Sequence, residues 1–166
     1  DALKDAGAEA QIVSPEKRHV KGWKLTDWGD TFDVDFVAHE IGHQYGGSHT
    51  FNGSGGNCAG GNRSATSAYE PGSGITIQAY AGICGADNLQ PNSDDYFHRR
   101  SLDQMLAFTT TGGGSTCGST SATGNTPPTV STTATFTIPA LTPFELTAAG
   151  SDGDGDGLTY IWEQYD

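Results

Sequence analysis

Three histidines and one glutamate stand at a spacing that can hold a metal ion and use it. Residues 39–49 read HEIGHQYGGSH, which fits the pattern H-E-x-x-H-x-x-G-x-x-H. Residues four apart on a helix lie about 40° apart around its axis and about 6 Å apart along it, so His39 and His43 can share one ion. Gly46 can adopt the positive φ that turns the chain back and brings His49 to the same point.

This ligand set predicts a catalytic zinc site rather than a structural one. Three neutral histidines leave the fourth position of Zn²⁺ open to water. The metal lowers the pKa of that water toward about 7 and polarises a substrate carbonyl group. Glu40 could take the proton of the water and pass it to a leaving amine. We therefore expect His39, His43 and His49 to hold zinc, with Glu40 as general base. The competing interpretation, histidines that merely pack or face solvent, does not account for the helix-breaking glycine.

The sequence resembles the metzincin zinc endopeptidases, most closely the secreted bacterial reprolysin-like (adamalysin-like) branch. The similarity covers roughly residues 18 to 117, and its motifs are residues 39–53, 68–74, 79–85 and 92–98. It implies an α+β metzincin-type catalytic domain, with a twisted sheet and an active-site helix, that hydrolyses internal bonds of a protein or peptide substrate. It also implies an edge strand before the helix, assigned here to residues 18–23, that pairs with extended substrate.

One position departs from the family pattern. Metzincins place a methionine in a tight turn beneath the ligands, two residues before a tyrosine in several branches, and this chain has Gln78 there. Its only methionine, Met105, lies in a later helical pattern without a matching tyrosine and is not accepted as a substitute. A glutamine amide buried under three imidazoles needs hydrogen-bond partners or costs stability. We expect a working site with altered stability or metal affinity.

Tyr80 is the second candidate catalytic residue. In the astacin and serralysin branches a tyrosine at the matching place donates a hydrogen bond to the oxyanion, so the resemblance implies that role for Tyr80. An aromatic side chain that only packs beside the helix is an equally good interpretation, because a phenol suits both. The sequence leaves the two interpretations open.

Composition is that of an extracellular protein. Asp and Glu total 20 against 8 Lys and Arg, so the net charge of −12 argues against nucleic acid as a partner. No segment approaches the roughly 18 apolar residues of a membrane helix, and the first residues show no export signal. Cys58, Cys84 and Cys117 suit the disulfides of an oxidising compartment, although three cannot all pair within the chain. We expect a soluble, secreted protein from which an export signal could have been removed, with no membrane partner.

The chain divides by composition into three segments. Residues 1–108 are expected to form the catalytic domain, with an incomplete N-terminal part, and residues 109–128 a linker rich in glycine and proline. Residues 129–166 resemble the start of an immunoglobulin-like β-sandwich module, which needs about 100 residues. The chain is therefore expected to be a piece of a longer polypeptide.

Within these segments the periodicity predicts individual elements. The active-site helix is expected over residues 33–45, and a second helix near Ser101, where Ser101 and Gln104 form a capping-box pattern. The remaining expected elements are a helix over residues 1–10 and strands over residues 11–13, 19–25, 135–138, 144–147 and 158–162.

An acidic turn near the end of the chain could bind Ca²⁺. Asp152, Asp154 and Asp156, with Glu163 further on, match the EF-hand expression D-x-D-x-D-G-x5-E. An EF-hand needs a helix on each side, whereas the flanking residues read as a turn and a strand. A calcium-binding turn or a merely solvated one is therefore favoured over a true EF-hand.

Two other function classes remain beside the enzyme. One is a catalytically silent binding protein that keeps zinc as a structural pin, with Gln78 as the mark of relaxed constraint. The other is an adhesive segment that acts only through the β-rich module. Chelator-sensitive cleavage that depends on Glu40 separates the enzyme from both.

Overall fold

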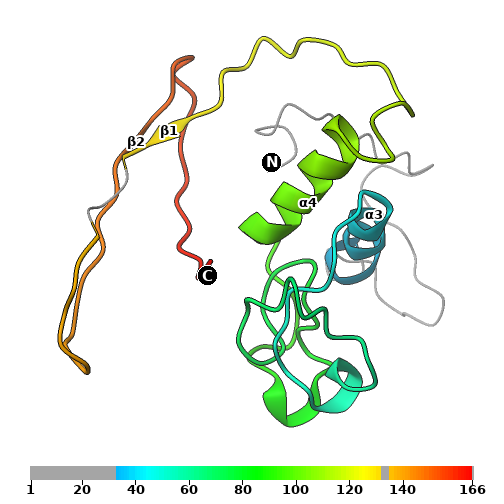
Figure 1. Cartoon of the computed structure of the whole chain (residues 1–166), viewed down its shortest axis with the longest axis vertical. Helices are drawn as coiled ribbons and strands as arrows, with labels where there is room; N and C mark the ends of the chain where they lie inside the picture. Colours follow the sequence, from blue (N-terminus) through cyan, green and yellow to red (C-terminus); the bar gives the residue numbers. More distant parts are fainter. Residues whose placement is uncertain (1–32, 132–134, 166) are drawn as a thin grey trace. The chain divides into compact units, whose positions relative to one another are not determined.

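The computed structural model describes residues 33–131 and 135–165 (Figure 1). The helix and strands expected before residue 33, including the substrate-pairing strand at residues 18–23, lie outside the described residues. The described chain divides into two compact units. One contains residues 33–120 and 162–165, with the histidine motif, and the other contains residues 121–161.

The histidine motif lies on a helical segment that tightens along its length. A π-helix, η1 (Asp33–Ala38), continues directly into α3 (His39–Gln44), which confirms the helix expected over residues 33–45. The helix then ends at the turn predicted for Gly46, which adopts a φ of +86°. The next amide, the N–H of Gly47, donates to the carbonyl of Gly42 at 2.8 Å. This reversal returns the chain to α3.

The second helix, α4 (Arg99–Thr110), begins earlier than expected. The predicted cap at Ser101 is wrong, because His98 is the N-cap residue and its Nδ1 accepts the N–H of Arg100 at 3.0 Å. Histidine is not among the residues that favour this position, so the capping pattern pointed to serine. Gln104 instead uses its Oε1 to accept the N–H of Ser48 at 3.0 Å, which ties α4 to the segment before His49.

Between the two helices the chain forms irregular loops, as its glycine content predicted. The only regular elements described there are two short 3₁₀ turns, η2 (Gly56–Cys58) and η3 (Gly85–Asp87). The twisted sheet expected for the catalytic domain is not seen among the described residues of this unit, which contain a single bridge between Phe51 and Glu70. The helices, together with a small antiparallel sheet in the other unit, are compatible with the α+β class.

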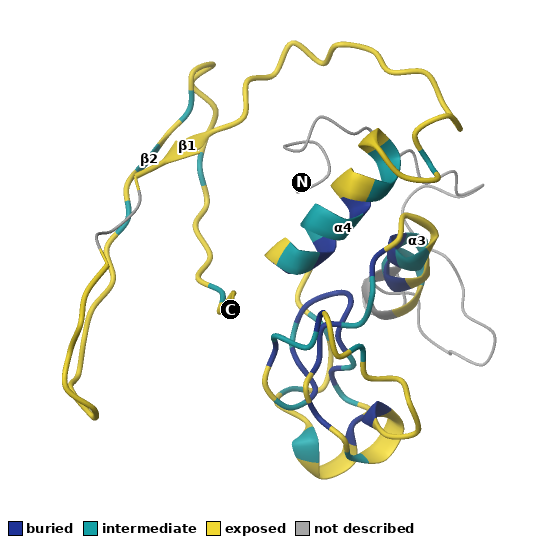
Figure 2. Cartoon of the chain, viewed as in Figure 1, coloured by how far each residue is buried: buried dark blue, intermediate teal, exposed yellow. Residues whose placement is uncertain are grey.

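Buried residues concentrate in these loops and on the facing sides of the helices (Figure 2). Two apolar clusters form the core of the described residues. The first contains Phe51 and the Cys58–Cys84 disulfide, with Tyr80 packed against it. The second contains Ile77, Phe97 and Met105, flanked by Ala38 and Leu102. Both clusters border the segment from residue 77 to residue 80.

A buried carboxylate joins the loops in place of a sheet. Glu70 is 5% exposed and accepts hydrogen bonds from both Oγ1 atoms of Thr50 and Thr76. It also accepts the backbone N–H of Ile75 at 2.8 Å and that of Thr76 at 3.0 Å. With four donors, the charge is fully solvated by the protein, which makes its burial tolerable. Glu70 thereby links the residue after His49 to the loop that leads to Gln78.

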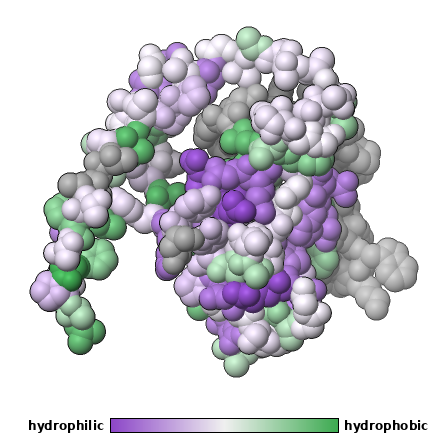
Figure 3. All heavy atoms as spheres, viewed as in Figure 1, coloured by the Kyte–Doolittle hydropathy of each residue, from purple (hydrophilic) through white to green (hydrophobic). Residues whose placement is uncertain are grey.

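In the described part of the unit of residues 121–161, β1 (Thr129–Val130) pairs in antiparallel fashion with β2 (Gly150–Ser151), and Thr129 lies opposite Ser151. The strands expected at residues 135–138, 144–147 and 158–162 are not present in the described chain. Alternating patterns predict strands only if a second layer covers the apolar face, and here Phe136 is 69% and Phe144 70% exposed. Apolar side chains accordingly lie on the surface of this unit (Figure 3).

The acidic turn has no flanking helix among the described residues. The carboxylate of Asp152 accepts the N–H groups of Asp154 and Asp156 at 2.8 and 3.1 Å, which is a local turn and not an EF-hand loop between helices. In the described part of the chain, no helix has the length and apolar content required to cross a bilayer.

Candidate metal centre

The three predicted ligands meet at one point. His39 and His43 project from α3, and His49 comes from the segment that follows the turn at Gly46. The Nε2 atom of His43 lies 3.0 Å from the Nε2 of His39 and 3.0 Å from the Nε2 of His49. Within residues 33–131 and 135–165, this is the only group of three or more His, Cys, Asp or Glu side chains that could hold a metal ion.

Each imidazole is oriented by a backbone carbonyl behind it. The Nδ1 atoms of His39, His43 and His49 lie 2.7, 2.7 and 2.6 Å from the carbonyl oxygens of Ile77, Gly47 and Asn62. In a neutral ring the Nδ1 that donates to a carbonyl carries the proton, so the Nε2 has an unshared pair. Three such pairs facing one another repel unless a cation lies between them.

The donor set fits a zinc ion. Tetrahedral Zn–N bonds of about 2.0–2.1 Å separate two ligand nitrogens by about 3.3 Å. The two Nε2 separations of 3.0 Å are close to that value. Carbonyl acceptors behind imidazole ligands are the usual outer partners of such sites. His39, His43 and His49 are the residues that would hold the metal.

Burial keeps two of the ligands, His39 and His49, in the form that binds metal. Loss of solvent lowers the pKa of His39 from 6.5 to about 4, while its hydrogen bond to Ile77 acts in the opposite direction. Loss of solvent also lowers the pKa of His49. Neutral imidazole is the ligand form, so no proton must leave these two rings near pH 7 before a cation enters.

Glu40 lies on α3 next to the first ligand and is exposed. Its negative charge raises the pKa of His39, of His49 and of Tyr80, in each case as a smaller effect than burial. The carboxylate is therefore within electrostatic reach of two ligands and of the tyrosine. An exposed carboxylate beside a metal site can exchange protons with water.

Tyr80 lies against the ligand rings. Its ring centroid is 4.4 Å from that of His49, 5.6 Å from that of His39 and 4.7 Å from that of Phe51. Burial, and then the charge of Glu40, raises the pKa of Tyr80, so its hydroxyl group stays protonated at neutral pH. The ring therefore packs beside the ligands, as the packing interpretation of Tyr80 requires. The hydroxyl also keeps the proton that it would need to donate a hydrogen bond to an oxyanion.

Residues 77–80, which we term the floor segment, touch all three ligands. The carbonyl of Ile77 accepts from His39, and the carbonyl of Gln78 accepts the N–H of Thr50 at 3.1 Å. The Gln78 side chain is fully buried, with its Nε2 3.3 Å from the Nδ1 of His43. The glutamine therefore lies where the family pattern has a methionine, while Met105, on α4, packs in the second apolar cluster together with Ile77.

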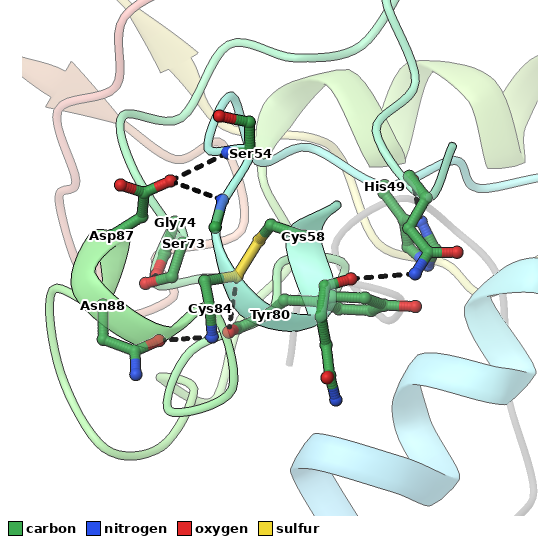
Figure 4. Close-up of a disulfide and its surroundings, with 12 residues drawn as sticks. His49, Ser54, Cys58, Ser73, Gly74, Tyr80, Cys84, Asp87 and Asn88 are labelled. Carbon is green, nitrogen blue, oxygen red and sulfur yellow. Dashed lines mark hydrogen bonds between the residues drawn. A yellow bond between two sulfur atoms is a disulfide. The ribbon is translucent and has the colours of Figure 1, made fainter. Parts of the chain in front are cut away.

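The loop behind His49 is tied down by a disulfide (Figure 4). Cys58 pairs with Cys84, and Cys117 is free and exposed, which resolves the pairing that the sequence left open. Nearby, Asp87 accepts the N–H groups of Ser54 and Gly55, each at 2.8 Å. These two bonds hold the pKa of Asp87 below its usual value.

Sequence reasoning missed several parts of the site. The carbonyls of Gly47, Ile77 and Asn62 gave no signal, because every residue carries the same backbone acceptor. Glu70 and Asp87 serve loop closure, and only a structure shows which N–H groups they accept. Outside the site, His98 caps α4 and stacks on Tyr69 with ring centroids 5.9 Å apart.

Comparison with known families finds one match. The model described as Metallo-peptidase family M12B, reprolysin-like, matches residues 14–107, which is more than half of the chain. The matched interval contains the three histidines, the floor segment and the disulfide. No curated protein and no solved structure matches the chain.

Proposed function

Because the chain belongs to the reprolysin-like M12B metallopeptidases, we propose that it is a secreted zinc metalloendopeptidase that hydrolyses internal bonds of proteins or peptides. The observation that carries this proposal is the convergence of three Nε2 atoms, each on a ring whose Nδ1 is bound to a carbonyl. A disulfide and the resemblance to secreted bacterial members support secretion.

When bound by His39, His43 and His49, zinc supplies a Lewis acid and an activated water. Glu40 accepts the proton of the attacking water at a carboxylate oxygen and later gives it to the nitrogen of the leaving amine. Its exposure and its electrostatic reach to both His39 and His49 support this role.

Tyr80 donates a hydrogen bond from its hydroxyl to the carbonyl oxygen of the scissile bond as negative charge develops there. Two observations support this role. The ring lies beside His49, and the raised pKa keeps the hydroxyl proton in place. A Tyr80→Phe variant retains the packing and loses only the donor, so it separates this role from simple packing.

For the whole chain we retain three segments as the organisation: residues 1–108 as the protease domain, residues 109–128 as a linker and residues 129–166 as the start of an immunoglobulin-like module. The change in composition at residue 109 supports this division, as do the exposed apolar residues of the last segment. Limited proteolysis that cuts first within residues 109–128 would support it.

The enzymatic mechanism is tested by cleavage of a casein-type substrate. We expect cleavage by the parent chain, loss of cleavage on chelation, return of cleavage on adding zinc, and a loss of at least about 100-fold in Glu40→Ala. Zinc content, measured by elemental analysis, should be the same in the parent and in Glu40→Ala, because Glu40 is not a ligand. Equal cleavage by the two proteins refutes the mechanism.

A second candidate is a catalytically silent protein that keeps zinc as a structural pin. The observation that favours it is the buried Gln78, whose Oε1 has no hydrogen-bond partner within the described chain. In that case the parent chain binds zinc and gains thermal stability from it, yet cleaves no substrate.

A further inference from the structure

The side chain of Gln78, in the floor segment, packs tightly against α3. Its side chain is 0% exposed. A Cβ atom built on Gly42 would lie 2.1 Å from its Oε1 and 2.8 Å from its Cδ, so the amide group lies directly on the backbone of the helix. The amide therefore cannot move out to water, and its polar atoms must find partners where they are.

Among the described residues, the amide has one possible hydrogen-bond partner, the ligand His43. The Nε2 of Gln78 lies 3.3 Å from the Nδ1 of His43, but that Nδ1 carries a proton and donates it to the carbonyl of Gly47 at 2.7 Å. An N–H group gains no acceptor there. Within residues 33–131 and 135–165 the Oε1 has no partner either, so in this orientation both ends of the amide are poorly satisfied.

A half-turn about the last side-chain bond exchanges the two ends of the amide. The oxygen then faces the Nδ1–H of His43 and accepts from it, together with the carbonyl of Gly47. The NH₂ group takes the place that has no partner. In this orientation the glutamine stabilises the tautomer that leaves Nε2 free for a cation, yet one end of the amide stays unpaired.

We propose that Gln78 is a positioning residue of the metal centre, whose Oε1 accepts a hydrogen bond from His43 and strengthens metal binding at a cost in the stability of the fold. A methionine at this position fills the space but accepts almost no hydrogen bond. The inference depends on the proposed function only in that a metal occupies the three Nε2 atoms. It therefore predicts opposite effects on metal affinity and on folding.

The test compares the parent chain with Gln78→Met. We expect the zinc dissociation constant of the variant, measured by competition with a fluorescent chelator, to rise about 10-fold. We expect the thermal unfolding midpoint of its metal-free form to rise by about 4 °C or more, because the unpaired amide group of Gln78 is removed. If Gln78 only fills space, its replacement by methionine should not weaken zinc binding while raising the stability of the metal-free fold.

Two further variants provide the controls. Gln78→Glu keeps an oxygen toward Nδ1 and should bind zinc within about 3-fold of the parent. Gln44→Met makes the same chemical change at an exposed position of α3, the helix that carries His43, and should change neither quantity. If Gln78→Met binds zinc as tightly as the parent, or if its metal-free form is less stable or does not fold, the inference is refuted. If the parent chain itself binds no zinc, the proposed function fails as well.

Discussion

Substitution of Gly42 by alanine tests how closely α3 approaches Gln78. Gly42 is the third residue after His39 and is buried. A Cβ there meets the Oε1 of Gln78 at 2.1 Å and the Cε1 of Phe97 at 3.0 Å. On an exposed helix the same change would stabilise the protein by about 1 kcal/mol, because alanine is the better helix former. At this buried position the steric contact with Gln78 opposes the gain in helix propensity.

The magnitude follows from which effect is larger. Real Cβ atoms do not approach a neighbour to 2.1 Å, so the buried Gln78 side chain or the helix must shift. Overpacking of a buried site costs about 1–3 kcal/mol. Because the contact is far inside the van der Waals limit, we take the upper end of that range and subtract the gain in helix propensity. The expected net loss is about 2 kcal/mol in the free energy of unfolding.

A double-mutant cycle identifies the source of the loss. Urea unfolding of the metal-free protein is measured for the parent, Gly42→Ala, Gln78→Ala and the double variant. In the Gln78→Ala background the methyl group enters the vacated space, so Gly42→Ala should be neutral or stabilising by up to about 1 kcal/mol. The coupling free energy should therefore be about 2–3 kcal/mol. A Gly42→Ala protein as stable as the parent, or an equal loss in both backgrounds, refutes this reasoning.

Three other substitutions or conditions give separate tests. Glu70→Ala removes the acceptor of four hydrogen bonds between loops. The free energy of unfolding, measured with urea, should fall by about 3–5 kcal/mol. A fall of less than about 1 kcal/mol would contradict the role given to this carboxylate. The double variant Cys58→Ser with Cys84→Ser should lose about 2–4 kcal/mol in the free energy of unfolding. It should also bind zinc more weakly, as measured by competition with a chelator. An unchanged zinc affinity would show that the disulfide does not position the ligands. Burial lowers the pKa of His39 from its ordinary value of 6.5 to about 4 in the folded protein. As the pH falls, the unfolded chain binds this proton first, so the metal-free protein should lose stability between about pH 6.5 and about pH 4. If the stability of His39→Gln depends on pH as strongly as that of the parent, other groups cause the dependence.

Part of the candidate site could be predicted because its parts are local. The spacing of His39 and His43 translates directly into position on a helix. The turn at Gly46 required only that one residue adopt a positive φ, which it does. Predictions that needed a distant partner were less reliable. The cap of α4 went to His98 in place of Ser101, and the strands expected after residue 129 lack a covering layer in the described chain.

The amino-acid sequence by itself determined the three imidazoles, the neighbouring carboxylate and the place where the helix must end, since helix geometry fixes how residues a few positions apart lie. Only the tertiary structure decided which carbonyls orient the rings, that Cys58 pairs with Cys84, and that the amide of Gln78 lies against both Gly42 and His43. Those contacts join residues far apart in the chain. Backbone acceptors and burial have no signature in residue type, because they depend on which segments meet when the chain folds.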